Sequence, residues 1–196
     1  MNYVITIGRQ YGSGGRYVGK LVAEELGIKF YDNELLSKVA QDFGFCESFI
    51  KENDEKRDGL FAYMGGSDPF VVSTPSQSVA NAQFRTIERL ANEESCVVVG
   101  RCSNYILREH KNVLNVFISA PQELREKRAV KYYGVPQDKV KKVLRQMDKR
   151  RASYYDYYTE EEWGYSANYD ICLSTALGVE ECARIIADCA RHLFNS

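Results

Sequence analysis

The fold is decided near the start of the chain, by the stretch Val4-Ile-Thr-Ile-Gly-Arg-Gln-Tyr-Gly-Ser-Gly-Gly-Arg16. Residues 3–7 form an apolar, β-branched run that is typical of a buried strand. Residues 8–15 are rich in glycine, and apolar residues then recur at helical spacing over residues 18–26, before Gly27 in a C-cap position. The stretch therefore predicts a strand, a glycine loop and a helix in that order.

The rest of the chain continues this alternation. Residues 28–31 predict a second strand, and Asp32 is placed to cap a helix over residues 33–43. Short apolar runs predict further strands over residues 96–99, 113–118 and 169–173. Strands that alternate with helices favour a parallel sheet with helices on its faces, an α/β fold. The other expected helices span residues 78–94, 121–133, 136–158 and 179–193.

Composition excludes several classes of protein. The 196 residues include 26 Lys and Arg against 27 Asp and Glu, a net charge of −1, which argues against a generally basic nucleic-acid binder. No stretch reaches the roughly 18 apolar residues of a membrane span, and no export signal is recognisable, so we expect a cytoplasmic protein without a membrane partner. The six cysteines are scattered and the two histidines lie far apart, which predicts reduced thiols and no metal site formed by Cys and His.

The glycine loop carries the clearest chemistry. A strand that leads into Gly12-Ser-Gly-Gly15 and then a helix aims backbone N–H groups and the helix dipole at one spot, which favours phosphate. The match to the pattern GxxxxGK[ST] is incomplete. Gln10 takes the place of the first glycine, Arg16 that of the lysine and Tyr17 that of the residue with the magnesium-binding hydroxyl. The dinucleotide pattern GxGxxG also lacks its last glycine. A glycine turn without a ligand is the alternative.

Five segments resemble, in the right order, the cytidylate kinase-like family, relatives of nucleoside monophosphate kinases among the P-loop proteins. They are residues 5–16, 30–36, 97–102, 148–155 and 169–175. The resemblance implies one three-layer P-loop kinase domain with a parallel five-stranded sheet flanked by helices. In that domain, residues 1–43, 79–120 and 165–196 would form the core, 44–78 a helical substrate-side insertion, and 121–160 a basic helical lid.

The resemblance also implies roles for particular residues. Arg125 and Arg128 would belong to the lid over the donor phosphates, while Asp148 and Arg151 would lie near the acceptor ribose and the transferred phosphoryl group. The ATP-binding loop would comprise Gly12, Ser13, Gly14, Gly15, Arg16 and Tyr17. The acceptor site would comprise Asp32, Asn33, Lys38, Arg101 and Asp148, and the catalytic set Arg16, Arg101, Arg125, Arg128, Asp148 and Arg151.

Physical chemistry supports this division of roles. Phosphoryl transfer needs positive charge from several elements around the phosphoryl oxygens, and residues 125–151 hold 11 basic against three acidic side chains. Asp148 and Arg151 stand three residues apart on a helix, which predicts an ion pair between them. Plainer roles stay open: Asp32 as a helix cap only, Lys38 as an ordinary exposed lysine, and the lid lysines as a solvated face. The aromatic residues 154–158 and Trp163 could stack a base, or pack on the core or on a partner subunit of a homodimer.

Magnesium is where the chain departs from the family. Tyr17 and Val99 stand where the family has a hydroxyl and an aspartate, so Ser13 or Asp32 would have to substitute, or nucleotide and water alone would hold Mg²⁺. The sequence predicts a phosphotransferase that uses ATP and Mg²⁺ on a nucleoside monophosphate or a similar small phosphorylated acceptor. The alternatives are a catalytically idle nucleotide-binding module and, third, a nucleic-acid binder that uses the basic helices.

Overall fold

A computed structural model describes residues 2–42 and 77–194, so residues 44–76 of the expected insertion lie outside the described residues. Two short 3-10 turns, Ser166–Asn168 and Thr175–Leu177, flank the last strand. The strands and α-helices are β1 (Val4–Arg9), α1 (Gly15–Leu26), β2 (Lys29–Tyr31), α2 (Asn33–Asp42), α4 (Gln77–Glu93), β3 (Cys96–Val99), α5 (Ser103–Ile106), β4 (Val113–Ser119), α6 (Gln122–Tyr133), α7 (Val140–Thr159), β5 (Ile171–Ser174) and α8 (Val179–Phe194).

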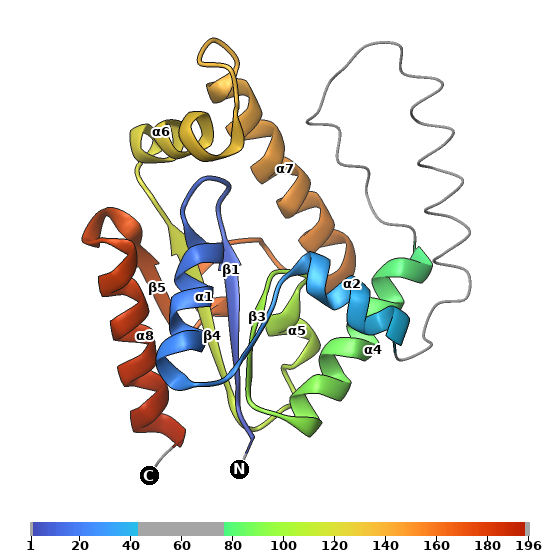
Figure 1. Ribbon diagram of the computed structural model, residues 1–196. Coiled ribbons are helices and arrows are strands. Elements are labelled where there is room, and N and C mark those ends of the chain that lie inside the picture. The colour runs from blue at the N-terminus through green and yellow to red at the C-terminus, as the bar shows by residue number, and fades with distance from the viewer. Residues whose placement is uncertain (1, 43–76, 195–196) are drawn as a thin grey trace.

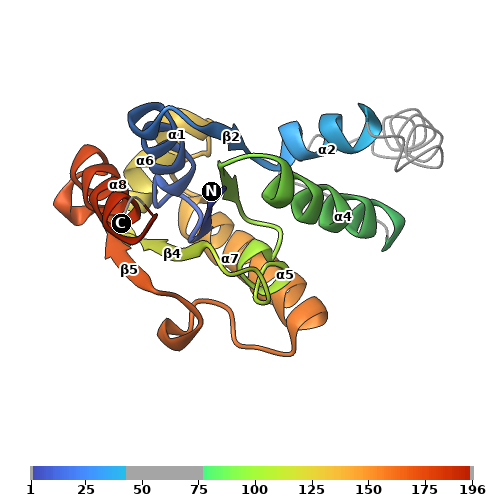
Figure 2. The ribbon, with the colours of Figure 1, turned by 90° about the horizontal axis from the view of Figure 1, so that it is seen from below.

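The five strands form one parallel sheet in the order β2-β3-β1-β4-β5. Val4 of the central strand β1 pairs with Cys96 on one side and with Val113 on the other. Helices α1 and α8 cover one face of the sheet, and α4 and α5 cover the other (Figures 1 and 2). This arrangement confirms the predicted α/β fold with a parallel five-stranded sheet.

Alternation along the strands explains the two faces. Ile5 and Ile7 are fully buried against α1 and α8, while Val4 and Val98 are fully buried against the helices on the opposite face. A strand that is buried on both faces loses the polar alternation of a half-exposed strand, which is why the strands read as continuous apolar runs. The core therefore lies on both sides of the sheet.

Several element boundaries differ from the expectation; helix α7, for example, begins at Val140 and not at residue 136. Strand β1 extends to Arg9, so Gly8 and Arg9 belong to the strand and not to the glycine loop. The last strand is Ile171–Ser174 instead of residues 169–173, because a short 3-10 turn and an extended Tyr169 precede it. The helix α5 was not predicted, since one turn is too short to show helical periodicity.

The basic segment folds as two helices over the end of β1 (Figure 1). Helix α6 ends at Gly134, whose φ of 65° is left-handed, and α7 follows, so the prediction of two helices joined at this glycine is confirmed. A small apolar core of their own holds the pair together, formed by Ala129, Val135, Val140, Val143 and Leu144. In residues 2–42 and 77–194, none of the helices has both the length and the apolar character that a membrane crossing requires.

Candidate active site

The predicted site residues gather at the carboxyl edge of the sheet. Because all strands are parallel, their carboxyl ends meet at one edge, where ligands bind in open α/β sheets. The glycine loop follows β1, Asp32 and Asn33 follow β2, Arg101 lies just beyond β3, and Thr175 follows β5. Segments that are far apart in sequence are therefore brought together here.

The glycine loop has the backbone of an anion site. Gly12 and Gly14 have φ values of 74° and 87°, a left-handed conformation that other residues rarely adopt. Gly14 caps α1, so the first N–H groups of that helix point out of its amino end. Within the part of the chain that the structure describes, no group accepts a hydrogen bond from the N–H of Gly12, Gly14, Arg16 or Tyr17. The loop therefore fits a phosphate group.

Helices α6 and α7 hold this loop through a cluster that we call the latch, formed by Tyr11, Arg125 and Asp148. Asp148 Oδ1 accepts a hydrogen bond from the Tyr11 N–H at 2.7 Å, and Arg125 Nε donates to the Tyr11 carbonyl at 2.7 Å. Arg125 and Asp148 also form an ion pair with little exposure to solvent. The expected ion pair between Asp148 and Arg151 is wrong, because Asp148 faces the neighbouring helix and Arg151 Nη1 donates to the Arg9 carbonyl at 2.8 Å.

A second arginine of α6, Arg128, also contacts the loop. Arg128 Nη1 donates to the Ser13 carbonyl and to Thr175 Oγ1, both at 2.7 Å. The Thr175 hydroxyl donates to the same Ser13 carbonyl at 2.6 Å. Arg125 and Arg128 thus shape the loop by binding its carbonyl groups.

Arg16, at the position of the P-loop lysine, is paired with Asp32. Their ion pair has an Nη2–Oδ2 distance of 2.6 Å, and the Arg16 side chain is 63% exposed while that of Asp32 is 5% exposed. Asp32 Oδ1 also accepts the N–H groups of Glu34 and Leu35 at 3.1 Å each, so it does cap α2. Burial raises the pKa of Asp32, but the Leu35 N–H, Arg16 and the Glu34 N–H together bring it below its ordinary value.

This lowered pKa predicts a pH-dependent contribution to stability. A carboxyl whose pKa is lower in the folded state stabilises the protein above its unfolded pKa of about 4 and loses that effect as the pH falls through the folded value. An Asp32→Asn variant keeps a capping residue and removes the charge. We therefore expect its free energy of unfolding at pH 7 to be about 1 kcal/mol lower than that of the wild type. Urea unfolding from pH 7 to pH 3 should show this difference shrinking, and a constant difference would contradict the assignment.

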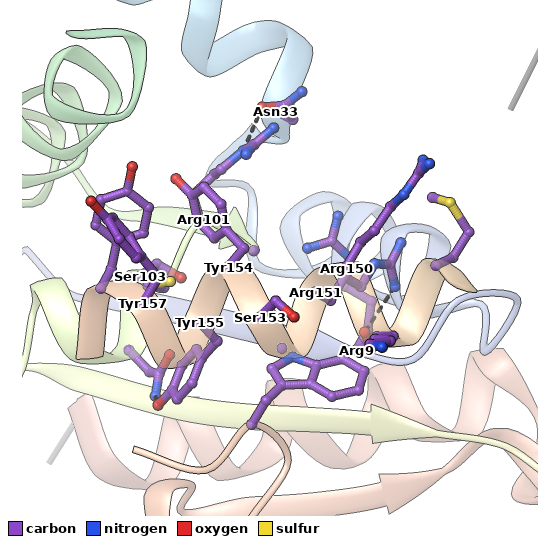
Figure 3. Close-up of a pocket in the computed structure, with 18 of the residues that line it drawn as sticks. Arg9, Asn33, Arg101, Ser103, Arg150, Arg151, Ser153, Tyr154, Tyr155 and Tyr157 are labelled. Carbon is purple, nitrogen blue, oxygen red and sulfur yellow. Dashed lines mark hydrogen bonds between the residues drawn. The ribbon is translucent and has the colours of Figure 1, made fainter. Parts of the chain in front are cut away.

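A cavity of about 790 Å³ opens beside the loop, between α7 and the ends of β1 and β3. Figure 3 shows Arg9, Arg150 and Arg151 grouped toward one end of α7, and Tyr155 and Tyr157 toward the other. No Asp or Glu occurs among the described residues that line it. Its basic residues are Arg9, Arg101, Lys149, Arg150 and Arg151, and its aromatic residues are Tyr154, Tyr155, Tyr157, Tyr158, Trp163 and Tyr169.

Arg101 is held in place at this cavity by neutral groups. Its Nε donates to Asn33 Oδ1 at 2.5 Å, and Gln83, which is buried, donates to the same oxygen at 3.1 Å (Figure 3). The guanidinium carbon lies 5.2 Å from the centre of the Tyr154 ring. Arg101 itself has a φ of 60°, a left-handed turn that brings its side chain to the strand end. Its charge thus remains available to an anion.

Tyr154 is a site residue that motif matching did not single out. Its hydroxyl is buried beside the Arg101 guanidinium and donates no hydrogen bond to any described residue. Burial raises the pKa of Tyr154 to about 12, so the hydroxyl keeps its proton and can donate it to a ligand at neutral pH. The sequence signal was the density of tyrosines on α7, which is equally typical of core packing.

A Tyr154→Phe variant tests whether this hydroxyl serves a ligand. The substitution removes a buried hydroxyl that donates no hydrogen bond to a described residue, so we expect an unchanged or slightly higher melting temperature, together with an acceptor KM that rises about 3- to 10-fold. Thermal melting and steady-state kinetics measure the two effects. Tyr132→Phe, at an exposed position on α6, is the matched control and should change neither. A lower melting temperature with an unchanged KM would give the hydroxyl a structural role.

Of the residues predicted for the acceptor site, Asn33 and Arg101 line the cavity, whereas Asp32, Lys38 and Asp148 do not. Lys38 is exposed on α2 and Tyr17 is half exposed on α1, and neither lines it. The substitutes considered for magnesium are already engaged: Ser13 Oγ accepts the Gly15 N–H at 3.3 Å, and both oxygens of Asp32 accept hydrogen bonds. The described residues also contain no group of three or more His, Cys, Asp or Glu side chains that could hold a metal ion.

A parallel sheet in this strand order, with a glycine loop and an arginine-lined cavity at one edge, is the fold of P-loop kinases. Residues 4–177 match the sequence profile of the Cytidylate kinase-like family, and the chain belongs to that family. The role supported by family and fold is that of a nucleotide kinase-like protein. No curated protein matches the sequence of this chain.

Solved structures support the same fold. An uncharacterized protein from Eubacterium ventriosum is 35% identical, with a TM-score of 0.77 over 98% of this chain and 99% of that one. A shikimate kinase from Bacteroides thetaiotaomicron is 14% identical, with a TM-score of 0.56 over 95% and 97% of the two chains. A gluconokinase from Sinorhizobium meliloti is 17% identical, also with a TM-score of 0.56, over 98% and 95%. The two kinases are similar to this chain in fold.

Proposed function

We propose that this protein is a phosphotransferase that moves the γ-phosphoryl group of ATP to a nucleoside monophosphate or a similar small phosphorylated acceptor. One observation carries the proposal: a glycine loop with free N–H groups and a cavity with five basic side chains lie next to each other at the carboxyl edge of the sheet. Two adjacent anion sites are what a donor triphosphate and an acceptor phosphate require.

The residues of each site suit these roles. The N–H groups of Gly12, Gly14, Arg16 and Tyr17 would bind donor phosphate oxygens, with the latch holding the loop in shape. Arg101 would bind the acceptor phosphate, and the aromatic residues of the cavity suit the base or another planar group.

A phosphate acceptor also agrees with the proton chemistry of the cavity. The described lining residues include no carboxylate and no histidine that could remove a proton from an alcohol. A phosphate monoester has its second pKa near 6, so its oxygen is already largely ionised at neutral pH and needs no general base. Mg²⁺ bound to the nucleotide would supply neutralising charge, with nucleotide and water as its ligands.

The proposal is tested by a coupled assay of ADP formation. The full-length protein is incubated with ATP, Mg²⁺ and each of the common ribonucleoside and deoxyribonucleoside monophosphates. We expect turnover with at least one of them above the rate of ATP hydrolysis alone, and a phosphorylated product by chromatography. Absence of product with every acceptor would sink the proposal.

A second function is favoured by the magnesium position. Tyr17 offers no metal-binding hydroxyl at the usual place, and Asp32 is occupied by Arg16. A nucleotide-binding module without transferase activity would have these features. Calorimetry distinguishes the two functions, because such a module would bind ATP tightly and yield no product, whereas any phosphorylated acceptor rules it out.

A further inference from the structure

Arg9 is a charged residue of the cavity to which neither the family resemblance nor the motif assigns a role. It is the last residue of β1, and its stem passes so close to α1 that a Cβ atom on Gly15 would lie 2.7 Å from the Arg9 Cβ. Its guanidinium lies over Gly100 at the end of β3, where no room is left for a Cβ atom. Arg9 therefore reaches from the glycine loop to the cavity, which it lines (Figure 3).

The guanidinium of Arg9 has no partner among residues 2–42 and 77–194. Among the described residues, no group accepts a hydrogen bond from it and no carboxylate forms an ion pair with it. Burial, followed by the charges of Arg151 and Arg101, lowers its pKa well below the ordinary value, although Asp32 acts in the opposite direction. Asp32 is already paired with Arg16, so it does not neutralise Arg9.

An arginine in this state requires an external anion. Burial of a charge without a counter-charge destabilises a protein. Arginine cannot relieve this by losing its proton, because it stays protonated at neutral pH. Its two neighbours do not relieve the cost, since Arg101 donates to the neutral Asn33 and Arg151 donates to the carbonyl of Arg9 itself. Three guanidinium groups thus converge beside the loop, and none of them forms an ion pair with a carboxylate in the described part of the chain.

We propose that Arg9 is the substrate-binding residue at the point of transfer, where its guanidinium binds the oxygens of the phosphate group that lies between the glycine loop and the cavity. The inference rests on the proposed function. An acceptor phosphate oxygen forms the new bond to the γ-phosphorus while the bond between that phosphorus and the β–γ bridging oxygen breaks, and ADP leaves with the electron pair. Arg9 donates hydrogen bonds throughout and keeps its proton, so it supplies positive charge to the transferred group.

Inorganic phosphate is the probe for the site itself. We expect calorimetry to show phosphate binding by the full-length protein, with affinity about 10- to 100-fold weaker in Arg9→Met. In phosphate-free buffer the melting temperature of Arg9→Met should equal or exceed that of the wild type, because an unpaired charge has been removed. Arg9→Lys keeps a charge without the planar fork and should show intermediate affinity. Arg108→Met, an exposed arginine before β4, is the matched control and should leave phosphate binding unchanged.

Several results would overturn the inference. The inference fails if the wild type does not bind phosphate, or if wild type and Arg9→Met bind it equally. It also fails if Arg9→Met has a lower melting temperature with unchanged phosphate affinity. If Arg9→Met does not fold, full phosphate affinity in Arg9→Lys would count against a role for the guanidinium fork.

Turnover separates this inference from the proposed function. With an acceptor that the protein phosphorylates, Arg9→Met should lower kcat about 100-fold or more with a smaller change in the KM of ATP, and an unchanged kcat would reject Arg9 as a residue at the point of transfer. If no monophosphate is phosphorylated, the proposed function fails, while phosphate affinity that depends on Arg9 still establishes the anion site.

Discussion

The free energy of unfolding of an Asp148→Asn variant is expected to be about 3 kcal/mol lower than that of the wild-type protein. The carboxylate of Asp148 binds two partners in the latch, the Tyr11 N–H and the Arg125 guanidinium. The amide oxygen of asparagine can still accept the Tyr11 N–H, but its NH₂ group would face Arg125 with donors only. A largely buried arginine would then lose its counter-charge, which is the costly case for a buried ion pair.

Equilibrium unfolding in urea, monitored by circular dichroism, measures this effect. Asp188→Asn is the matched control, because Asp188 pairs with Arg184 and Arg191 on the exposed side of α8 and its side chain is 52% exposed. We expect the control to lose less than about 1 kcal/mol. Equal losses in the two variants would mean that the latch contributes no more than a surface ion pair.

Replacing Arg101 by methionine is expected to lower kcat/KM for the acceptor about 100- to 1000-fold. Methionine keeps an unbranched stem beside Tyr154 but removes the charge and the donor to Asn33. The backbone cost of the left-handed φ is the same for both residues, so the fold should be retained. Arg101→Lys restores the charge without the planar fork and should recover only part of the loss.

Steady-state kinetics with the acceptor found in the turnover assay measures this effect, and Arg108→Met again serves as the control. The expected loss falls on the acceptor, so the KM of ATP should change little. A kcat/KM within about threefold of the wild-type value would remove Arg101 from the acceptor site.

The strands and the loop could be predicted from sequence because their signals are local. A run of β-branched residues, glycines next to it and a helical period after it all occur within the first 26 residues. Arg101 was found only through the family resemblance, since its place at the cavity depends on the parallel alignment of β1 with β3.

Interactions between distant residues escaped the prediction. The spacing of Asp148 and Arg151 on one helix suggested an ion pair, whereas the actual partners of Asp148 lie on α6 and, 137 residues away, at Tyr11. Helical spacing shows which side chains share a face, but not which element packs against that face. Arg9 was missed for a related reason, because the end of β1 was placed two residues too early.

The Ser13 carbonyl, shared by Arg128 and Thr175, ties the glycine loop to the last quarter of the chain. During synthesis Ser13 leaves the ribosome 162 residues before Thr175. The glycine loop therefore acquires its final shape late, after β5 has joined the edge of the sheet. Until then the growing chain carries the residues of a phosphate site without the complete set of hydrogen bonds that shapes it.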